Sequence, residues 1–249
     1  MNRKKIESAL GFFWEPTPIF LPQEEKPGEA LFVFQKNMAG MVWNALGVFE
    51  NNPSTLPQTE TILQGQSVSG ISIDHLLQVK QFADGARFLI TAIKHKTFAL
   101  DIAFAAQLHA RVGKEEALEW GISQNRQVHI RGASHVPPAA DALPQLAEKG
   151  FFFLREQVKD SVERAVAVFL FMSRSPFFFD CNKRTASLMM NGALLSEGYY
   201  PITVLRESAE AFNEKLSGFY NTGDATPMMR YFVAVSSTLY KEQTKKLTD

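Results

Sequence analysis

The residues from 180 to 184 combine side chains of the types that proteins use to bind phosphate together with Mg²⁺. The segment is Asp180, Cys181, Asn182, Lys183 and Arg184. Lys183 and Arg184 carry fixed positive charges, and the guanidinium fork of Arg184 suits phosphate oxygens. A carboxylate such as Asp180, placed beside phosphates, is how proteins commonly hold Mg²⁺. Asp180 is therefore a candidate metal ligand, and Cys181, Asn182, Lys183 and Arg184 are candidate phosphate-binding residues.

This segment is expected at the start of a helix, where an anion is favoured without any side chain. Apolar stripes with helical spacing flank it, over 158–172 and 188–194. The free N–H groups and the positive dipole end of a helix form such a site. Asp180 could instead act only as the N-cap, with Lys183 and Arg184 as a solvated first turn. Cations at a helix start oppose the dipole, so their presence favours an anionic ligand.

The rest of the chain predicts an all-α fold with one small β-hairpin. Residues 1 to about 30 are rich in proline, and we expect an extended lead-in that packs through its aromatic side chains. Residues 127–132 alternate polar and apolar side chains around a glycine, which is a hairpin signal. Helical periodicity, caps and stop signals predict helices over 32–49, after Thr55, over 76–93 with Asp74 as the cap, and over 98–108, 158–172, 188–194, 207–220 and 227–244.

Composition narrows the class of protein. Lys plus Arg and Asp plus Glu each number 26, which gives no reason to expect nucleic acid or a membrane surface as a partner. No apolar run approaches the roughly 20 residues that span a bilayer, and the N-terminus lacks a cleavage site for a signal peptide. The single cysteine, Cys181, excludes an intramolecular disulfide. We expect a cytoplasmic protein.

The segment Pro176–Ser187 resembles the signature of the Fic/Doc (Fido) family. The usual form of that signature is His-Pro-Phe-x-(Asp/Glu)-Gly-Asn-Gly-Arg-x-x-Arg. The resemblance runs from about residue 40 to 235 and includes Gln107-Leu108-His109, the flap over Val128–Pro138, Met189–Gly192 and Gly198-Tyr199. It implies a Fic-type helical core with a β-hairpin flap over 66–249, preceded by an N-terminal helical extension over 1–65.

The resemblance also implies an activity and assigns roles to residues. Family members transfer part of a nucleotide, most often AMP from ATP in the presence of Mg²⁺, to a hydroxyl group of a target protein. Asp180 matches the metal ligand, Asn182 the centre of the phosphate cradle and Arg184 the first arginine, whereas Cys181 and Lys183 stand where glycines are usual. The implied cofactors are ATP, or another nucleotide, and Mg²⁺. The implied partner is an unidentified target protein docked on the flap at Val128, His129, Ile130 and Arg131.

The chain departs from the family pattern at two positions. Pro176 stands where the signature has the histidine that acts as general base, and proline has no titratable group. General-base catalysis contributes about 10²–10⁴-fold, so we expect transferase activity to be weak or absent. Ser187 replaces the second arginine. Lys183 occurs in the Doc branch, which phosphorylates its targets, but that branch keeps the histidine.

A segment upstream resembles the inhibitory helix of many family members. Its pattern is (Ser/Thr)-x-x-x-Glu-(Gly/Asn), and here Glu50-Asn51 supplies the last two residues while Leu46 occupies the Ser/Thr position. The family glutamate obstructs the site of the terminal phosphate and pairs with the second arginine, which is Ser187 here. Glu50 is therefore a candidate inhibitory residue. The alternative is a surface residue near a helix end.

Three functional hypotheses follow from these observations. The first is a nucleotide-binding Fic-type protein whose transferase activity is weak or lost. The second is an active AMP- or phosphoryl-transferase in which the target or a water supplies the base. The third is a non-catalytic module that binds an extended target along the flap by strand addition. His109 is expected to pack or bond locally at a helix end. Cys181, beside cations at a helix start, is a candidate for a lowered pKa, whereas burial of its thiol would have the opposite effect. The oligomeric state stays open.

Overall fold

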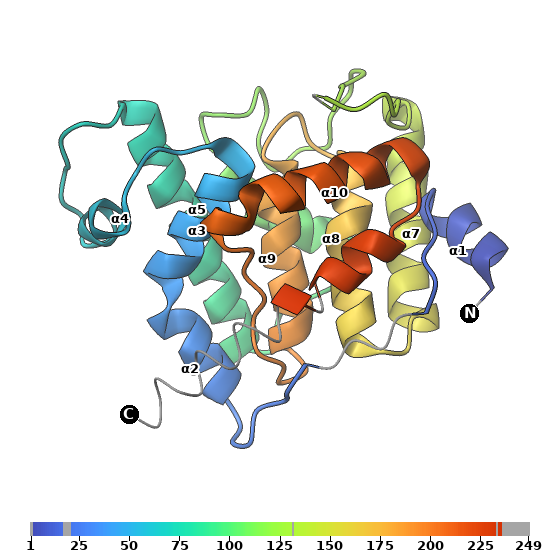
Figure 1. The fold of residues 1–249 in the computed structure, drawn as a ribbon, viewed down its shortest axis with the longest axis horizontal. Coiled ribbons are helices and arrows are strands. Elements are labelled where there is room, and N and C mark those ends of the chain that lie inside the picture. The colour runs from blue at the N-terminus through green and yellow to red at the C-terminus, as the bar shows by residue number, and fades with distance from the viewer. Residues whose placement is uncertain (1, 17–20, 131, 233, 236–249) are drawn as a thin grey trace.

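The computed structural model describes residues 2–16, 21–130, 132–232 and 234–235. Within these residues the chain is helical, which confirms the all-α prediction (Figure 1). Residues 226–232 are also helical, and the rest of the helix predicted over 227–244 lies partly outside the described residues. The elements are α1 (Arg3–Leu10), α2 (Glu29–Lys36), α3 (Met38–Glu50), α4 (Leu56–Leu63), α5 (Ile73–Lys94), α6 (Ile102–Val112), η1 (Ala140–Ala142), α7 (Leu143–Gln157), α8 (Ser161–Arg174), α9 (Asn182–Leu195), η2 (Arg206–Ser208) and α10 (Ala209–Thr222).

Helices α8 and α9 form the centre of the fold. They make the most extensive helix–helix contact among the described elements, and α3, α5, α6 and α7 pack around them (Figure 1). Helix α8 begins at Asp160, whose side chain accepts the N–H of Glu163, and the predicted stripe from Val162 to Met172 is buried. From Arg184 to Leu195 every residue of α9 is buried. The first turn of α9 is therefore where its polar side chains reach the edge of the core.

Helix α3 ends beside the first turn of α9. The structure corrects the single helix predicted over 32–49, because the chain turns at Asn37 and forms α2 and α3 separately. At the other end, Asn51 adopts the left-handed conformation, with φ of 54°, and the N–H of Asn52 bonds to the carbonyl of Leu46. This cap stops α3 at Glu50 and directs its C-terminal turn toward the residues of the signature.

The N-terminal lead-in contains a helix that the periodicity did not predict. Helix α1 has Asn2 as N-cap and Gly11 as a left-handed C-cap, and such a short element has too few turns to show a clear apolar stripe. The predicted packing through aromatic residues is confirmed, because Phe12 and Trp14 are both buried. Phe13 then pairs with the chain near Asp224 through an isolated bridge.

The predicted β-hairpin is absent from the described part of the flap, 122–130 and 132–139. The alternation of side chains there was real, but a two-stranded hairpin needs a third strand or an apolar face to be stable. The amide of Gln127 instead bonds to the carbonyls of Val128 and Pro137. Arg131 lies outside the described residues. Helix α7, which follows the flap, was not predicted.

The remaining helices agree with the sequence to within a few residues. Helix α4 has the expected Thr55 cap, completed as a capping box by Gln58. Helix α5 is capped by Ser72, and not by Asp74 as predicted, because Asp74 falls inside the first turn. Asp101 caps α6, so this helix runs later than the predicted 98–108.

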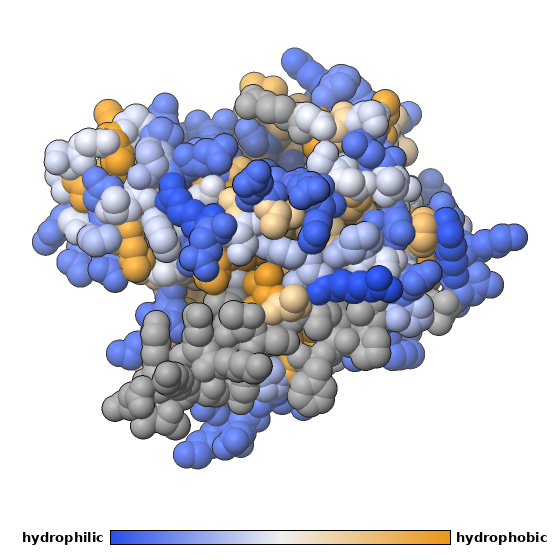
Figure 2. Space-filling view, in the orientation of Figure 1, coloured by the Kyte–Doolittle hydropathy of each residue, from blue (hydrophilic) through white to orange (hydrophobic). Residues whose placement is uncertain are grey.

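Polar and charged residues cover most of the face shown in Figure 2, with apolar residues scattered among them. None of the described helices combines the length and the apolar character that crossing a bilayer requires.

Candidate functional site

The loop before α9 is held closed by the side chain of Asn182. Its Oδ1 accepts the backbone N–H of Phe178 at 3.0 Å, and its Nδ2 donates to the carbonyl of Phe178 at 2.7 Å. A side-chain amide that satisfies both backbone groups of one residue replaces the pairing that a strand would provide. The candidate cradle residue thus fixes the path of the loop from 178 to 182.

The upstream half of the loop is fixed by Gln124, which the sequence did not single out. Its Nε2 donates to the carbonyl of Pro176 at 2.6 Å, and its backbone N–H donates to the carbonyl of Phe177 at 2.9 Å. Pro176, which the resemblance places at the position of the signature histidine, is buried and its carbonyl is already bonded. No local sequence pattern could have indicated Gln124, because it lies about fifty residues away in an irregular segment.

His109 packs against the loop before α9 and is not available as a general base. It is fully buried at the end of α6 and stacks on Phe178, with ring centroids 4.1 Å apart and planes 6° from parallel. Its Nδ1 accepts the N–H of Gly121 at 2.9 Å, so its Nε2 carries the proton and donates to the carbonyl of Asp180 at 3.1 Å. Burial lowers the pKa of His109 to about 4. The imidazole is neutral at pH 7 and both of its nitrogens are bonded.

Asp180 is exposed at the tip of the loop, and its Oδ1 accepts the N–H of Cys181 at 2.7 Å. One carboxylate at the edge of an anion site suits Mg²⁺ only where phosphates and water supply the other ligands. Among the described residues no group of three His, Cys, Asp or Glu side chains could hold a metal ion. The chain thus fits a metal that arrives with a nucleotide better than a resident one.

Cys181 is the N-cap residue of α9, and its environment contradicts the expected lowering of its pKa. It adopts a left-handed conformation, with φ of 57°, which explains why glycine is usual at this position. The side chain is buried, and burial raises the pKa of the thiol far above its ordinary value despite the nearby charge of Arg184. Burial outweighs the helix dipole and the cations, so the thiol is protonated at neutral pH.

Arg184 is fully buried and bound by groups of the chain itself. Its Nε donates to Oε1 of Glu50 at 2.9 Å. Its Nη1 and Nη2 donate to the two carboxylate oxygens of Glu116 at 2.9 and 2.6 Å, and Nη2 also contacts Sγ of Cys181 at 2.9 Å. Burial opposes the charge of Arg184, but Glu50 and Glu116 outweigh that effect and raise the pKa of the guanidinium. The arginine that matches a phosphate ligand is thus occupied by two carboxylates.

Lys183 is directed toward α3. Its Nζ donates to the carbonyl of Phe49 at 3.0 Å and lies 5.8 Å from the centre of the Phe49 ring. Burial lowers the pKa of Lys183, and the carboxylate of Glu50 opposes that change. The side chain of Glu50 is 20% exposed, and burial raises its pKa although Arg184 and Lys183 act in the opposite direction. Glu50 therefore pairs with Arg184 and lies within electrostatic reach of Lys183.

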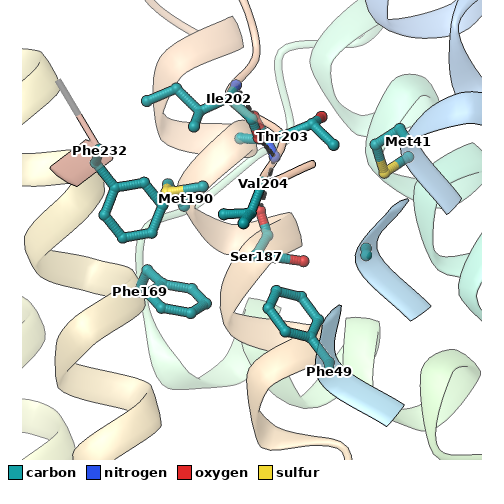
Figure 3. Close-up of a pocket in the computed structure, with 11 residues that line it drawn as sticks. Met41, Phe49, Phe169, Ser187, Met190, Ile202, Thr203, Val204 and Phe232 are labelled. Atoms are coloured by element: carbon teal, nitrogen blue, oxygen red, sulfur yellow. Dashed lines mark hydrogen bonds between the residues drawn. The ribbon is translucent and has the colours of Figure 1, made fainter. Parts of the chain in front are cut away.

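Ser187, which replaces the second arginine, faces an apolar wall. It is buried, and its hydroxyl donates to the carbonyl of Arg184 at 2.8 Å. It lines a cavity of about 20 Å³ together with Phe49, Phe169 and Met190, and Figure 3 shows Ser187 and Phe49 next to each other on its border. Ser187 carries no charge to pair with Glu50, and Glu50 pairs instead with Arg184, one turn of α9 earlier than the family pairing implied.

The flap residues do not take part in this cluster of charges. Val128 is half-buried, His129 is exposed, and Ile130 is half-buried and packs against the core. Further along, the flap is tied to α10, where Oδ1 of Asn221 accepts the N–H of Ser134 at 2.8 Å. The structure thus brings together the predicted residues from 180 to 184 with Glu50 and adds Glu116, Gln124 and His109. The predicted docking residues Val128, His129 and Ile130 lie apart from these charges.

Comparison of the sequence with known proteins gives a consistent group of relatives, although no family model matches the chain. It is 28% identical over 196 residues to the protein adenylyltransferase Fic of Drosophila willistoni, which covers 76% of this chain and 38% of that protein. The protein of the same description from Drosophila grimshawi is 27% identical over 196 residues, covering 76% of this chain and 39% of that protein. The chain spans less than two-fifths of the length of these relatives.

Solved structures show the same fold. Fic-1 from C. elegans matches with a TM-score of 0.78 at 23% identity, covering 90% of this chain and 67% of that one. A Fic domain containing signaling protein from Bacteroides thetaiotaomicron matches with a TM-score of 0.69 at 19% identity, covering 95% of this chain and 94% of that one. IbpAFic2, solved in complex with adenylylated Cdc42, matches with a TM-score of 0.58 at 14% identity, covering 95% of this chain and 76% of that one. The chain is thus similar in sequence to proteins named adenylyltransferase Fic, and it shares the fold of solved Fic proteins.

Proposed function

We propose that this chain binds a nucleotide with Mg²⁺ at the start of α9, is held closed by Glu50, and transfers AMP slowly or not at all. The observation that carries the proposal is the pairing of Arg184 with Glu50. A buried guanidinium and an adjacent lysine at a helix N-terminus form a strong anion site, and the chain fills it with its own carboxylate. A cationic site that is occupied by the carboxylate of Glu50 is consistent with phosphate binding that is regulated by release of Glu50.

The ligand is assigned by the chemistry of the first turn of α9. The helix has no side-chain cap, so the N–H groups of its first turn are available to phosphate oxygens. Arg184 supplies bidentate donors once its internal partners leave, and exposed Asp180 supplies a carboxylate for a metal bound to the same phosphates. The relatives named as adenylyltransferases support ATP as this nucleotide.

Slow transfer follows from the position of Pro176. Moving AMP to a protein hydroxyl forms a bond from that oxygen to the α-phosphorus and expels pyrophosphate, and the hydroxyl proton must go to a base. Pro176 has no group that accepts a proton, and neutral His109 has both ring nitrogens bonded. Losing a general base costs about 10²–10⁴-fold in rate.

The partner we propose is a protein with a hydroxyl side chain, because IbpAFic2 was solved with adenylylated Cdc42. The flap is the proposed docking segment, with Val128, His129, Ile130 and Arg131 as the contact residues. Its irregular backbone offers no ready-made strand edge in the described residues, so a purely strand-adding binding module is the weaker proposal. The strand could still form when an extended target pairs with it.

Calorimetric titration of ATP with Mg²⁺ tests the nucleotide site. We expect weak binding to the wild-type chain, tighter binding to Glu50→Ala, and loss of the Mg²⁺ dependence in Asp180→Ala. Lys149→Ala, remote from the loop, is the control and should bind as the wild type does. If none of these proteins binds ATP, the proposal is wrong and flap docking becomes the better account.

Labelled ATP tests the chemistry. The wild-type chain is expected to transfer little label to itself or to candidate proteins, whereas Glu50→Ala combined with Pro176→His should transfer label from the α-phosphate. Label from the γ-phosphate would indicate phosphoryl transfer. Robust transfer by the wild-type chain that disappears in Asp180→Ala would show that the target or a water supplies the base, and would overturn the weak-transfer proposal.

A further inference from the structure

We infer that Glu116 is a second internal competitor for Arg184, so that removing Glu50 alone opens the site only in part. This inference rests on the proposed nucleotide site. Glu50 makes one hydrogen bond to Nε of Arg184, whereas Glu116 takes the Nη1–Nη2 face with two, at 2.9 and 2.6 Å. The bidentate face is the one that matches two oxygens of a phosphate. Glu116 therefore occupies the part of Arg184 that a nucleotide needs most.

The two carboxylates reach Arg184 from different parts of the chain. Glu50 is the last residue of α3, and Glu116 lies in the segment 113–121 between α6 and the flap. With one bond from Nε, one from Nη1 and two from Nη2, most donors of the guanidinium are taken. If α3 moved away, Glu116 would still hold Arg184, because the two glutamates accept from different nitrogens of the guanidinium.

The side chain of Glu116 can move away from Arg184 without any unfolding of the core. Its side chain is 26% exposed, and it lines an open, polar cavity of about 500 Å³ beside the start of α5. Gln78 on α5 already donates to Oε1 of Glu116 at 3.0 Å. A carboxylate that swings toward this cavity would enter water, which is a much smaller cost than burying it unpaired. Glu116 thus acts as a positioning residue that holds Arg184 away from a phosphate.

Leaving Glu116 in place would also weaken nucleotide binding by repulsion. A nucleotide phosphate brought to Arg184 would meet a carboxylate within hydrogen-bond reach of the same nitrogens. Like charges at that distance disfavour each other strongly in a partly buried site. Glu116 and a phosphate therefore cannot bind the Nη1–Nη2 face of Arg184 at the same time.

The closing experiment measures ATP–Mg²⁺ binding and the reactivity of Cys181 in the same variants. Glu116→Gln keeps the shape and removes the charge. Glu115→Gln is the matched control, because Glu115 is exposed and its ion pair is a 3.9 Å contact with Lys114 and not with Arg184. We expect Glu50→Ala/Glu116→Gln to bind ATP at least about tenfold tighter than Glu50→Ala alone. Replacing Glu116 by Asp, which is shorter, should give an intermediate affinity.

Cys181 reports on Arg184 without any nucleotide. It is the only cysteine of the chain, it is buried, and its Sγ contacts Nη2 of Arg184. Alkylation requires local opening, so Glu116→Gln should raise the alkylation rate at least about fivefold over Glu115→Gln. Urea denaturation of the same proteins shows whether this rise exceeds what a loss of global stability explains, and Glu116→Asp covers the case of a poorly folded Gln variant.

Each outcome decides a different claim. An unchanged alkylation rate in both Glu116 variants, or ATP affinity in the double variant equal to that of Glu50→Ala, overturns the role of Glu116. Faster alkylation with tighter ATP binding supports it. Faster alkylation with no ATP binding in any variant supports the hold of Glu116 on Arg184 and refutes the proposed nucleotide site.

Discussion

The loop before α9 and the flap over 122–139 are both irregular, but they are held in opposite ways. In the loop, Pro176, Phe177 and Phe178 are buried, and their backbone groups are bonded to Gln124 and Asn182. In the flap most side chains are exposed, and the amide of Gln127 makes its two bonds at 3.2 Å. Buried backbone groups must find partners inside the protein, whereas exposed ones bond to water.

This difference shows which irregular segment has a conformation fixed by the protein itself. The loop is specified by side chains that bond to its backbone, so its geometry does not depend on a ligand or a target. The flap has fewer such supports, one of which is Oδ1 of Asn221 accepting the N–H of Ser134. A target would have to order the rest of the flap at a cost in conformational entropy. We therefore expect nucleotide binding to be preorganised on the loop side and target binding to be adaptive on the flap side.

Arg184→Ala should break the loop side most severely. It leaves Glu50 and Glu116 without their cation, and removing one partner of a buried ion pair costs about 3–5 kcal/mol of unfolding free energy. Urea denaturation measures the loss. Arg87→Ala is the control, because its pair with Asp84 is exposed and should contribute less than about 1 kcal/mol. Equal losses in the two variants would show that the cluster around Arg184 is not what holds the loop.

A pH series should show the contribution of His109. Its pKa in the folded chain is about 4, against about 6.5 when unfolded, so the unfolded state binds the proton first. Its stabilisation is complete above pH 6.5 and is lost as the pH falls toward 4, by about 3 kcal/mol in all. We expect unfolding free energies measured at pH 7 and pH 4.5 to differ more for the wild type than for His109→Gln. Parallel losses in the two proteins would contradict a buried, neutral imidazole.

The smallest expected loss of unfolding free energy comes from removing a side-chain amide, either Asn182 in the loop or Gln127 in the flap. Asn182→Ala removes both bonds to Phe178 and leaves buried backbone groups unpaired, which costs about 1–3 kcal/mol. Gln127→Ala in the flap removes bonds that water replaces, so its cost should stay within about 0.5 kcal/mol. Thermal unfolding of the two variants checks the difference. A Gln127→Ala loss as large as that of Asn182→Ala would mean that the flap is as firmly held as the loop.

Most helices could be predicted from the sequence because their apolar stripes and caps act locally. Asp160, Thr55 and Ser72 cap helices within a few residues of the apolar stripes of those helices. For α5 the sequence predicts Asp74 as the cap, two residues after the observed Ser72. The failures share a physical cause. Helix α1 is too short for periodicity to show, and the alternation over 127–132 is not sufficient for a hairpin without further strands.

The sequence by itself determined which side chains stand at the positions that resemble the Fic signature. Pro176 cannot accept a proton in any fold, and the register that places Asp180, Asn182 and Arg184 depends only on their order. These conclusions needed no coordinates because they concern the identity of side chains.

Only the tertiary structure decided what those residues contact. Arg184 is bound by Glu50 and Glu116, which lie 134 and 68 positions away along the chain. Neighbouring charges in the sequence favoured a reactive Cys181, but burial raises its pKa. Burial and the partners of a charge arise from packing between distant elements, so the pairing of Arg184 with Glu50 and Glu116 is a property of the fold.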